Sequence, residues 1–319
     1  MPRSNDFTDK QAYWVANSIP TAVSQIRQEG KCPKFARQFI LDQLRFNDNG
    51  NNEYSDNYKV AGLLSALADC LIPEKTSKNQ ILFEDDEEND EPARFRDTII
   101  EELDRYRRMD NWNPSHHNIY TVTVLDCKHK LMAAGIIPVE AIEFTPFTHD
   151  GTSDFVRIKA FKALMDLGFI TTNSLARYLL NIASTDKSPY VRLHLFEAFS
   201  LGLATVALGE APKKQIRPPP AADGDTLIIE EEASNEERKA LIARTTSIEG
   251  ALAALKRELK GNLTLKEALW NAVKSHSLNI YEQTDFLDIC WILYDAVESM
   301  VVNLRLPRYY EATNLGKVC

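Results

Sequence analysis

The stretch DFVRIKAFKAL, residues 154–164, recurs in weaker form 35 residues later as PYVRLHLFEAF, residues 189–199. Val156 and Arg157 of the first copy correspond to Val191 and Arg192 of the second. A more degenerate copy begins at Asp56, and a fourth candidate within 117–134 has no fixed register. A period of about 35–40 residues is typical of an α-solenoid, in which stacked helix pairs share one core because a single pair cannot bury its own apolar face.

The repeat pattern also indicates which residues hold the repeats together. The spacing D-x-V-R-x-x-A-x-x-A-L resembles the second helix of HEAT-type repeats. That resemblance implies that Val156 and Val191 face neighbouring helices, that Asp154 caps its helix, and that each arginine pairs with an acid of the adjacent repeat. We therefore interpret Asp154, Arg157 and Arg192 as structural positions, and treat a binding ladder as the weaker alternative. The predicted fold class is all-α, a HEAT/ARM-like solenoid of antiparallel helix pairs.

Helical periodicity extends over most of the chain. One apolar stripe lies within 55–72, and Phe95, Ile99, Leu103 and Tyr106 form another at helical spacing. The segment 119–125 is the best strand candidate, but helical composition follows it directly, so we predict helix there. Only 12 of the 319 residues are glycine, which disfavours an all-β fold with tight hairpins. Further helices are expected after Pro33, Pro114, Pro138, Asp154, Thr171 and Pro189, and over 234–258, 264–276 and 281–304.

Two segments interrupt the helical pattern. The run EDDEEND at 84–90 predicts a solvated acidic loop, because such a block repels itself and cannot enter a core. Residues 210–233 contain three consecutive prolines, which exclude helix and favour a linker or a disordered insertion. We therefore predict HEAT-like repeats over 1–209, a linker over 210–233, and C-terminal helical repeats or a cap over 234–319.

Composition and charge exclude several classes of protein. A hydrophobic fraction of 44% and a charged fraction of 26% are ordinary for a folded chain. The formal net charge of −9 argues against a protein that binds duplex DNA through its overall field. The five cysteines form no CxxC pair and predict reduced thiols of the cytosol or nucleus. The polar N-terminus predicts no signal peptide, and the apolar stretch 193–209 is short enough to predict a buried helix and no membrane association.

The sequence contains no recognisable catalytic constellation. There is no HExxH, no pair of histidines at helical i, i+4 spacing, and no phosphate-binding or nucleophile-elbow motif. His116 and His117 are adjacent, so we expect their side chains to point in different directions. We therefore predict no catalytic residue, no metal, no cofactor and no small-molecule substrate.

Five residues are candidates for partner binding. Arg105, Arg107 and Arg108 lie near the end of a predicted helix, where interaction with the helix dipole is the favoured interpretation and contact with phosphate or an acidic peptide is the alternative. Trp270 and Trp291 are expected mainly in the core of the last helices. A terminal repeat exposes an open face, however, so these two tryptophans are also candidates for a partner surface.

Three blocks of sequence resemble a known family. They are FNDNGNNEYSDNY at 46–58, residues 113–135, and residues 152–204 with the element SPYVR at 188–192. They are similar to the helical-repeat region of the second TBP-associated factors of the general transcription factor TFIID, and the NDN…YSDNY block is the most specific part. The match is good over roughly 35–205 and less clear in 1–34.

The resemblance implies a nuclear, non-catalytic scaffold that supports promoter recognition and transcription initiation by RNA polymerase II. It implies contacts with other TBP-associated factors, notably the tail of the eighth, a histone-fold subunit, and at most weak or indirect contact with promoter DNA. Family members carry upstream a region similar to M1-type aminopeptidases. Two alternatives therefore stay open: the C-terminal helical domain of an active M1-type zinc aminopeptidase, and a generic HEAT-repeat adaptor.

Overall fold

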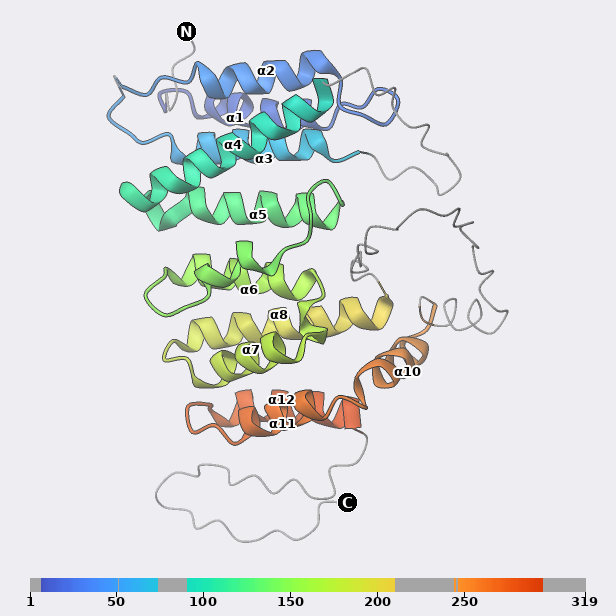
Figure 1. The fold of residues 1–319 in the computed structure, drawn as a ribbon. Helices are drawn as coiled ribbons and strands as arrows, with labels where there is room; N and C mark the ends of the chain where they lie inside the picture. The colour runs from blue at the N-terminus through green and yellow to red at the C-terminus, as the bar shows by residue number, and fades with distance from the viewer. Residues whose placement is uncertain (1–6, 51, 74–90, 210–243, 245, 295–319) are drawn as a thin grey trace, which may run out of the picture. The chain divides into compact units, whose positions relative to one another are not determined.

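The computed structural model describes residues 7–50, 52–73, 91–209, 244 and 246–294 (Figure 1). Within these residues every regular element is an α-helix or a short 3₁₀ helix, and the only β pairing is an isolated bridge between Gln28 and Lys31. The predicted all-α repeat fold is confirmed for the described residues. The chain divides into two compact units, 1–163 and 164–319. This division differs from the predicted boundary at 210–233, which lies outside the described residues and stays a prediction.

The first unit is built around one apolar helix. Helix α3 packs against α1, α2 and α5, and α5 lies alongside it in Figure 1. Eight of the fifteen residues of α3 are buried, so its apolar surface covers more than one face, as expected for a central helix. The helices of this unit are α1 (Lys10–Ser24), α2 (Lys34–Arg45), α3 (Asn57–Leu71), α4 (Glu91–Trp112), α5 (Ile119–Ala133) and most of α6 (Asp154–Asp166).

A buried carboxylate joins α4 to α5. Asp110 is only 1% exposed, yet its two oxygens accept four hydrogen bonds. Oδ1 accepts from the backbone N–H and hydroxyl of Ser115 at 2.7 and 2.6 Å, and Oδ2 accepts from those of Thr121 at 3.0 and 2.5 Å. Thr121 lies in the first turn of α5, where backbone N–H groups have no partner within the helix. Asp110 therefore caps α5 from the preceding helix and fixes the turn between them.

The second unit consists of two layers of helices that contact one another directly. Helix α7 packs against α8 and α11, α8 against α10, and α12 against both α10 and α11. Side chains of Ser188, Ser247 and Asn262 accept backbone hydrogen bonds and cap α8, α10 and α11, so these helices begin where the sequence supplies an N-cap. Their bounds are α7 (Asn173–Thr185), α8 (Pro189–Leu208), α10 (Ile248–Leu259), α11 (Leu263–Val273) and α12 (Ile280–Tyr294).

Helix α8 is the one described helix that is long and apolar enough to cross a membrane, judged by length and composition alone. Half of its most apolar window is buried inside the protein, and the helix packs against α7 and α10. Its buried arginine, Arg192, is held by an ion pair within the second unit. These contacts are those of a core helix, as the sequence predicts for this stretch.

Two elements add to or differ from the sequence prediction. Helical repeats were predicted from residue 1 without bounds for a helix before Pro33, and α1 spans fifteen residues there, with Pro20 inside it and Asp9 accepting from the N–H groups of Gln11 and Ala12 at its start. The helix expected after Pro138 is wrong, because the chain forms only two 3₁₀ turns there, at 141–143 and 145–147. The predicted helices over 234–258 and 281–304 are described only in part, as α10 and α12. The acidic run at 84–90 lies outside the described residues.

Candidate interaction surfaces

The two arginines of the repeat motif are both buried but have different partners. Arg157 pairs with Asp150 at 3.0 Å and more distantly with Asp154 at 3.8 Å, and its Nε donates to the carbonyl of Thr148 at 3.4 Å. These partners lie in the loop just before α6 or in its first turn. These two acids of Arg157 are therefore local, and the pairing with an acid of an adjacent repeat stays a prediction for this residue. Asp154 is the first residue of α6 and follows Ser153, so it lies in the first turn and not at the cap position.

Arg192 makes the long-range pairing that the motif predicts. Its Nε and one terminal nitrogen donate to the two carboxylate oxygens of Glu282, at 3.0 and 3.2 Å, from α8 to the first turn of α12. The other terminal nitrogen donates to the carbonyl of Asp186 at 2.8 Å, at the end of α7. Three helices thus meet at one guanidinium. Val156 and Val191, the valines of the two copies, are buried in the cores of their units.

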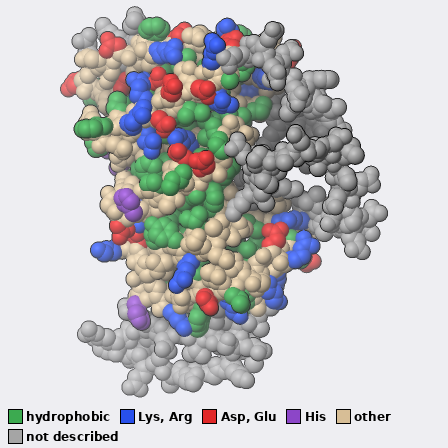
Figure 2. Space-filling model, viewed as in Figure 1, with side chains coloured by type: hydrophobic (Ala, Val, Ile, Leu, Met, Phe, Trp, Pro, Cys, Tyr) green, Lys and Arg blue, Asp and Glu red, His purple; other side chains and the backbone are tan. Residues whose placement is uncertain are grey.

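The arginine row on α4 does not lie where the sequence placed it. Helix α4 continues to Trp112, and its last turn contains no basic residue, so the expected dipole interaction is absent. Arg105 pairs with Glu102 at 2.6 Å and lies over the ring of Tyr106, and Arg107 pairs with Asp104 at 3.4 Å. Arg108 is exposed. Figure 2 shows acidic and basic side chains interspersed on the visible face of the α1–α4 end of the chain. Because the opposite charges are mixed, the net electrostatic field around the α4 arginines is small.

The two candidate tryptophans lie on different helices of the second unit. Trp270, on α11, is half-buried, and the ammonium of Lys274 lies 4.4 Å from its ring. Trp291, on α12, is 65% exposed and so does not belong to the core. An exposed indole is a common anchor in protein interfaces, which keeps Trp291 as a candidate contact.

No metal centre or activated nucleophile is present among the described residues. No group of three or more His, Cys, Asp or Glu side chains within them could hold a metal ion. The expectation that His116 and His117 point apart is wrong: their ring centroids lie 3.9 Å apart, because the chain leaves helical geometry at His117, where φ is 55°. Burial raises the pKa of the Cys127 thiol to about 12 and that of Cys290 to about 11, which makes both poor nucleophiles at neutral pH.

Charged side chains on α5 bind it to its neighbours. Asp126 accepts from Lys159 of α6 at 2.5 Å and lies 3.6 Å from Lys130, which in turn pairs with Asp69 of α3 at 3.3 Å. Burial alone would raise the pKa of Asp126, but its hydrogen bond and ion pair with Lys159 outweigh burial, and the pKa is lowered. This network is structural, because every member already has an opposite charge beside it.

Sequence reasoning missed an exposed aromatic cluster at the start of the first unit, which we define as Phe7, Tyr13, Trp14 and Tyr54. The ring of Phe7 lies 4.7 Å from that of Tyr13 in a tilted arrangement and 5.5 Å from that of Tyr54 edge to face, and Tyr13 meets Trp14 edge to face at 5.6 Å. Trp14 is 67% exposed. Tyr54 belongs to the NDN…YSDNY block, whose loop is held by its own hydrogen bonds, such as that from Asn49 to the carbonyl of Tyr54 at 2.8 Å. Rigid, exposed aromatic rings are typical of partner surfaces.

A second missed feature is a polar groove between α7 and α11, with a volume of about 630 Å³. Its floor is made of the buried small residues Ala268 and Ala272, and Asn181 and Asn271 are exposed along it. Amide and hydroxyl side chains can donate to and accept from a peptide backbone, and Arg177 adds one positive charge. The groove is lined by Ser174, Arg177, Tyr178, Asn181, Ser184, Thr185, Ala268, Asn271, Ala272 and Ser275.

A family model described as "TAF2-like, TPR repeats" matches residues 1–204. This chain belongs to that family. The match includes residues 1–34, where the sequence resemblance was less clear, and so it includes α1 and the aromatic cluster. The description assigns the repeats to the TPR type, which, like HEAT repeats, are stacked helix pairs.

Curated relatives agree with the family model. The chain is 32% identical over 99% of its length to transcription initiation factor TFIID subunit 2 of Schizosaccharomyces pombe. It is 33% identical over 60% of its length to the Danio rerio protein of that name, and 23% identical over 97% to the Saccharomyces cerevisiae protein. The chain spans 26%, 16% and 23% of these relatives, about a quarter of their length or less. The aminopeptidase and the generic adaptor gain no support from these comparisons.

Proposed function

We propose that this TAF2-like chain is a non-catalytic interaction module of TFIID that acts in the nucleus in promoter recognition and transcription initiation by RNA polymerase II. The observation that carries the proposal is the match over 99% of the chain to a relative named as a TFIID subunit. The described residues add support for an interaction role, because they present a groove and exposed aromatic rings.

The partner we propose is an extended tail of another TBP-associated factor, notably the eighth, which would lie in the polar groove between α7 and α11. The exposed amides of Asn181 and Asn271 match a peptide backbone, and Arg177 matches an acidic side chain. A tail that is disordered when free loses entropy on binding, so several weak contacts spread along a groove are needed to offset that cost. The aromatic cluster, the α4 arginines and Trp291 are further contact candidates, and any promoter DNA contact is weak or indirect.

The proposal is tested by gel filtration of the full chain with the tail of the eighth TBP-associated factor, followed by cross-linking mass spectrometry. We expect co-elution, with cross-links to Lys266 of α11 and to Lys274 just after it, which lie close in sequence to the groove residues Ala268 and Ser275. Replacing both groove amides, in the double variant Asn181→Ala and Asn271→Ala, is expected to weaken binding about tenfold, since each lost hydrogen bond costs about 0.5–1.5 kcal/mol. The matched control is Asn113→Ala, an exposed amide of the first unit.

Different results separate the site from the function. Co-elution with cross-links concentrated on the α4 row or on the aromatic cluster would move the site and keep the function. Failure of every TFIID subunit to bind the folded chain would reject the interaction role. A direct DNA contact would show as an affinity that falls steeply with salt, because phosphate binding releases counterions.

A further inference from the structure

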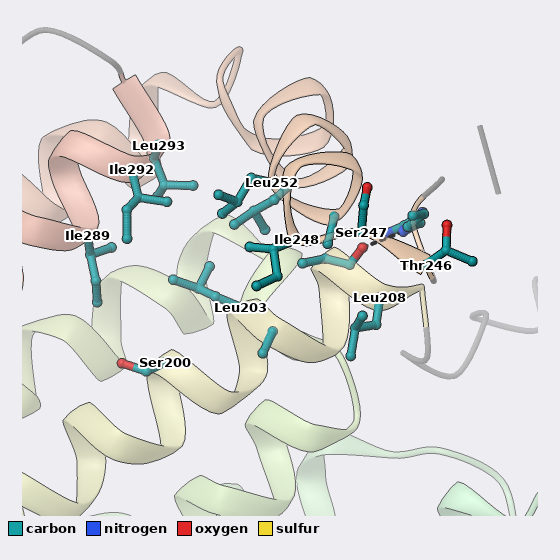
Figure 3. Close-up of a pocket in the computed structure, with 15 residues that line it drawn as sticks. Ser200, Leu203, Leu208, Thr246, Ser247, Ile248, Leu252, Ile289, Ile292 and Leu293 are labelled. Carbon is teal, nitrogen blue, oxygen red and sulfur yellow. Dashed lines mark hydrogen bonds between the residues drawn. The ribbon is translucent and has the colours of Figure 1, made fainter. Parts of the chain in front are cut away.

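The second unit contains an apolar groove of about 500 Å³ between α8, α10 and α12 (Figure 3). Figure 3 shows Leu203 and Leu208 of α8, Ile248 and Leu252 of α10, and Ile292 of α12 facing the same space. Ile248 is 81% exposed, which is costly for a branched aliphatic side chain unless something covers it. Apart from Arg244 and three hydroxyl residues at 200, 246 and 247, the lining is aliphatic.

The charged group at this groove already has its partners. The guanidinium of Arg244 donates to the carbonyls of Val206 and Ala207 at the end of α8, and pairs with Glu258 at 2.9 Å. These carbonyls belong to the last turn of a helix, where a cation is favoured. Arg244 therefore closes the end of α8 and joins it to α10. The groove offers little to a polar or anionic ligand and fits an aliphatic one.

The groove lies where the chain leaves α12. Its α12 wall is formed by Ile289, Ile292 and Leu293, which belong to the last two turns of a helix described to Tyr294. Residues 295–319, a segment of 25 residues, continue the chain from that point. The segment that follows Tyr294 thus starts beside the groove and can reach it at small entropic cost, because the loop to be closed is short.

The sequence of this segment continues the apolar stripe of α12. Ala296, Met300 and Leu304 follow Leu293 by 3, 7 and 11 residues, which is the spacing of one helix face. The helix predicted from sequence over 281–304 includes all three. Proline at 307 sets a limit to that helix.

We propose that residues 296–304 dock as the continuation of this stripe into the groove between α8 and α10. In this proposal Met300, the middle residue of the stripe, is paired with Leu252 of α10, and that pairing is what the tests below address. The occupant is this segment of the same chain, bound in place, and the groove is not a free site for a small molecule or a second protein.

The first test is hydrogen exchange of the full 319-residue chain, read over residues 203–208 and 248–255. Replacing the docked apolar side chain in Met300→Asp is expected to speed exchange there about tenfold, because the local opening becomes easier. Val302→Asp is the matched control: two residues further on, it lies about 200° round the helix, on the opposite side from the stripe. Amides of α3 serve as the reference and are expected not to change in either variant.

The second test joins the two surfaces directly and needs no loss of stability. In a Cys319→Ser background, the pair Leu252→Cys and Met300→Cys is expected to form an intramolecular disulfide on mild oxidation. The pair Leu252→Cys and Val302→Cys is expected to form little. Equal yields for the two pairs, or equal exchange in Met300→Asp and Val302→Asp, would overturn the proposal. A third result would also overturn the proposal. If the groove is protected from hydrogen exchange only at protein concentrations at which the measured molecular mass also rises, the occupant is a second copy of the chain.

Discussion

Arg157 of the first unit and Arg192 of the second occupy the same position of two repeat copies 35 residues apart, yet they do different things. Both side chains are buried, at 5% and 8% exposure. Asp150, which pairs with Arg157 at 3.0 Å, is 85% exposed and belongs to the adjoining loop, so that contact is local. The acid that pairs with Arg192, Glu282, is 16% exposed and lies 90 residues away on another helix.

The difference teaches that a repeat motif specifies a buried cation but not its counter-ion. Burial of the arginine stem follows from the helix face, which the motif fixes through its valine and alanine positions. The partner depends on which loop or helix arrives next to that face, and this varies from copy to copy. Arg192 therefore connects helices of its unit, and Arg157 fastens a loop to its own helix.

Arg192→Ala is expected to be the most damaging of the substitutions that test this difference. It removes the ion-pair partner of the largely buried carboxylate of Glu282, which keeps the N–H of Asn279 as a donor, and removes one donor from the carbonyl of Asp186. Removing one member of a buried pair typically costs about 3–5 kcal/mol, and denaturant unfolding measures that loss directly. In a double-mutant cycle with Glu282→Ala, the double variant should be less unstable than the sum of the two singles. Strict additivity would mean that the two side chains are not coupled.

Arg157→Ala is expected to cost less, about 1–2 kcal/mol, since an exposed acid loses little when its partner is removed and the loss comes mainly from packing of the arginine stem. Hydrogen exchange should show the effect in the loop before α6 and in its first turn. A cost equal to that of Arg192→Ala would remove the distinction between the two arginines. Arg108→Ala, at an exposed position of α4, provides the baseline for a surface arginine.

More of the fold class than of the candidate site could be predicted from the sequence. Helical stripes predicted α3 and α4 because their apolar spacing records a buried face directly. Helix α5 was predicted from the helical composition that follows its β-branched first turns. Helix α1 lies within the predicted repeat region but was given no bounds, although Asp9 offered an N-cap signal. The helix expected after Pro138 failed because a second proline, at 146, and short local turns take up that segment.

The candidate surfaces could not be predicted in the same way, because each joins residues that are far apart in the chain. Tyr54 meets Phe7 across α1 and α2, and Asn181 faces the same groove as Asn271 from 90 residues away. The directions of the His116 and His117 side chains were predicted wrongly for a related reason. The two rings lie against each other because the backbone at His117 has a positive φ. Spacing predicts a face only where the local conformation is regular.

The smallest of the expected effects is a dependence of stability on pH. It should arise in the first unit and not at Arg192. The pKa of Asp126 is lowered in the folded chain, chiefly because Lys159 outweighs the effect of burial. A carboxyl group with a lowered folded pKa stabilises the protein above its unfolded pKa, near 3.8, and that contribution is lost as pH falls through the folded value. Asp126→Asn should therefore lower stability at neutral pH by less than about 1 kcal/mol, the usual range for a partly exposed ion pair. The variant and the parent chain should converge once the pH falls below the folded pKa of Asp126, as followed by urea unfolding at each pH with unit-resolved hydrogen exchange. A constant difference across that range would show that Asp126 acts through packing and not through its charge.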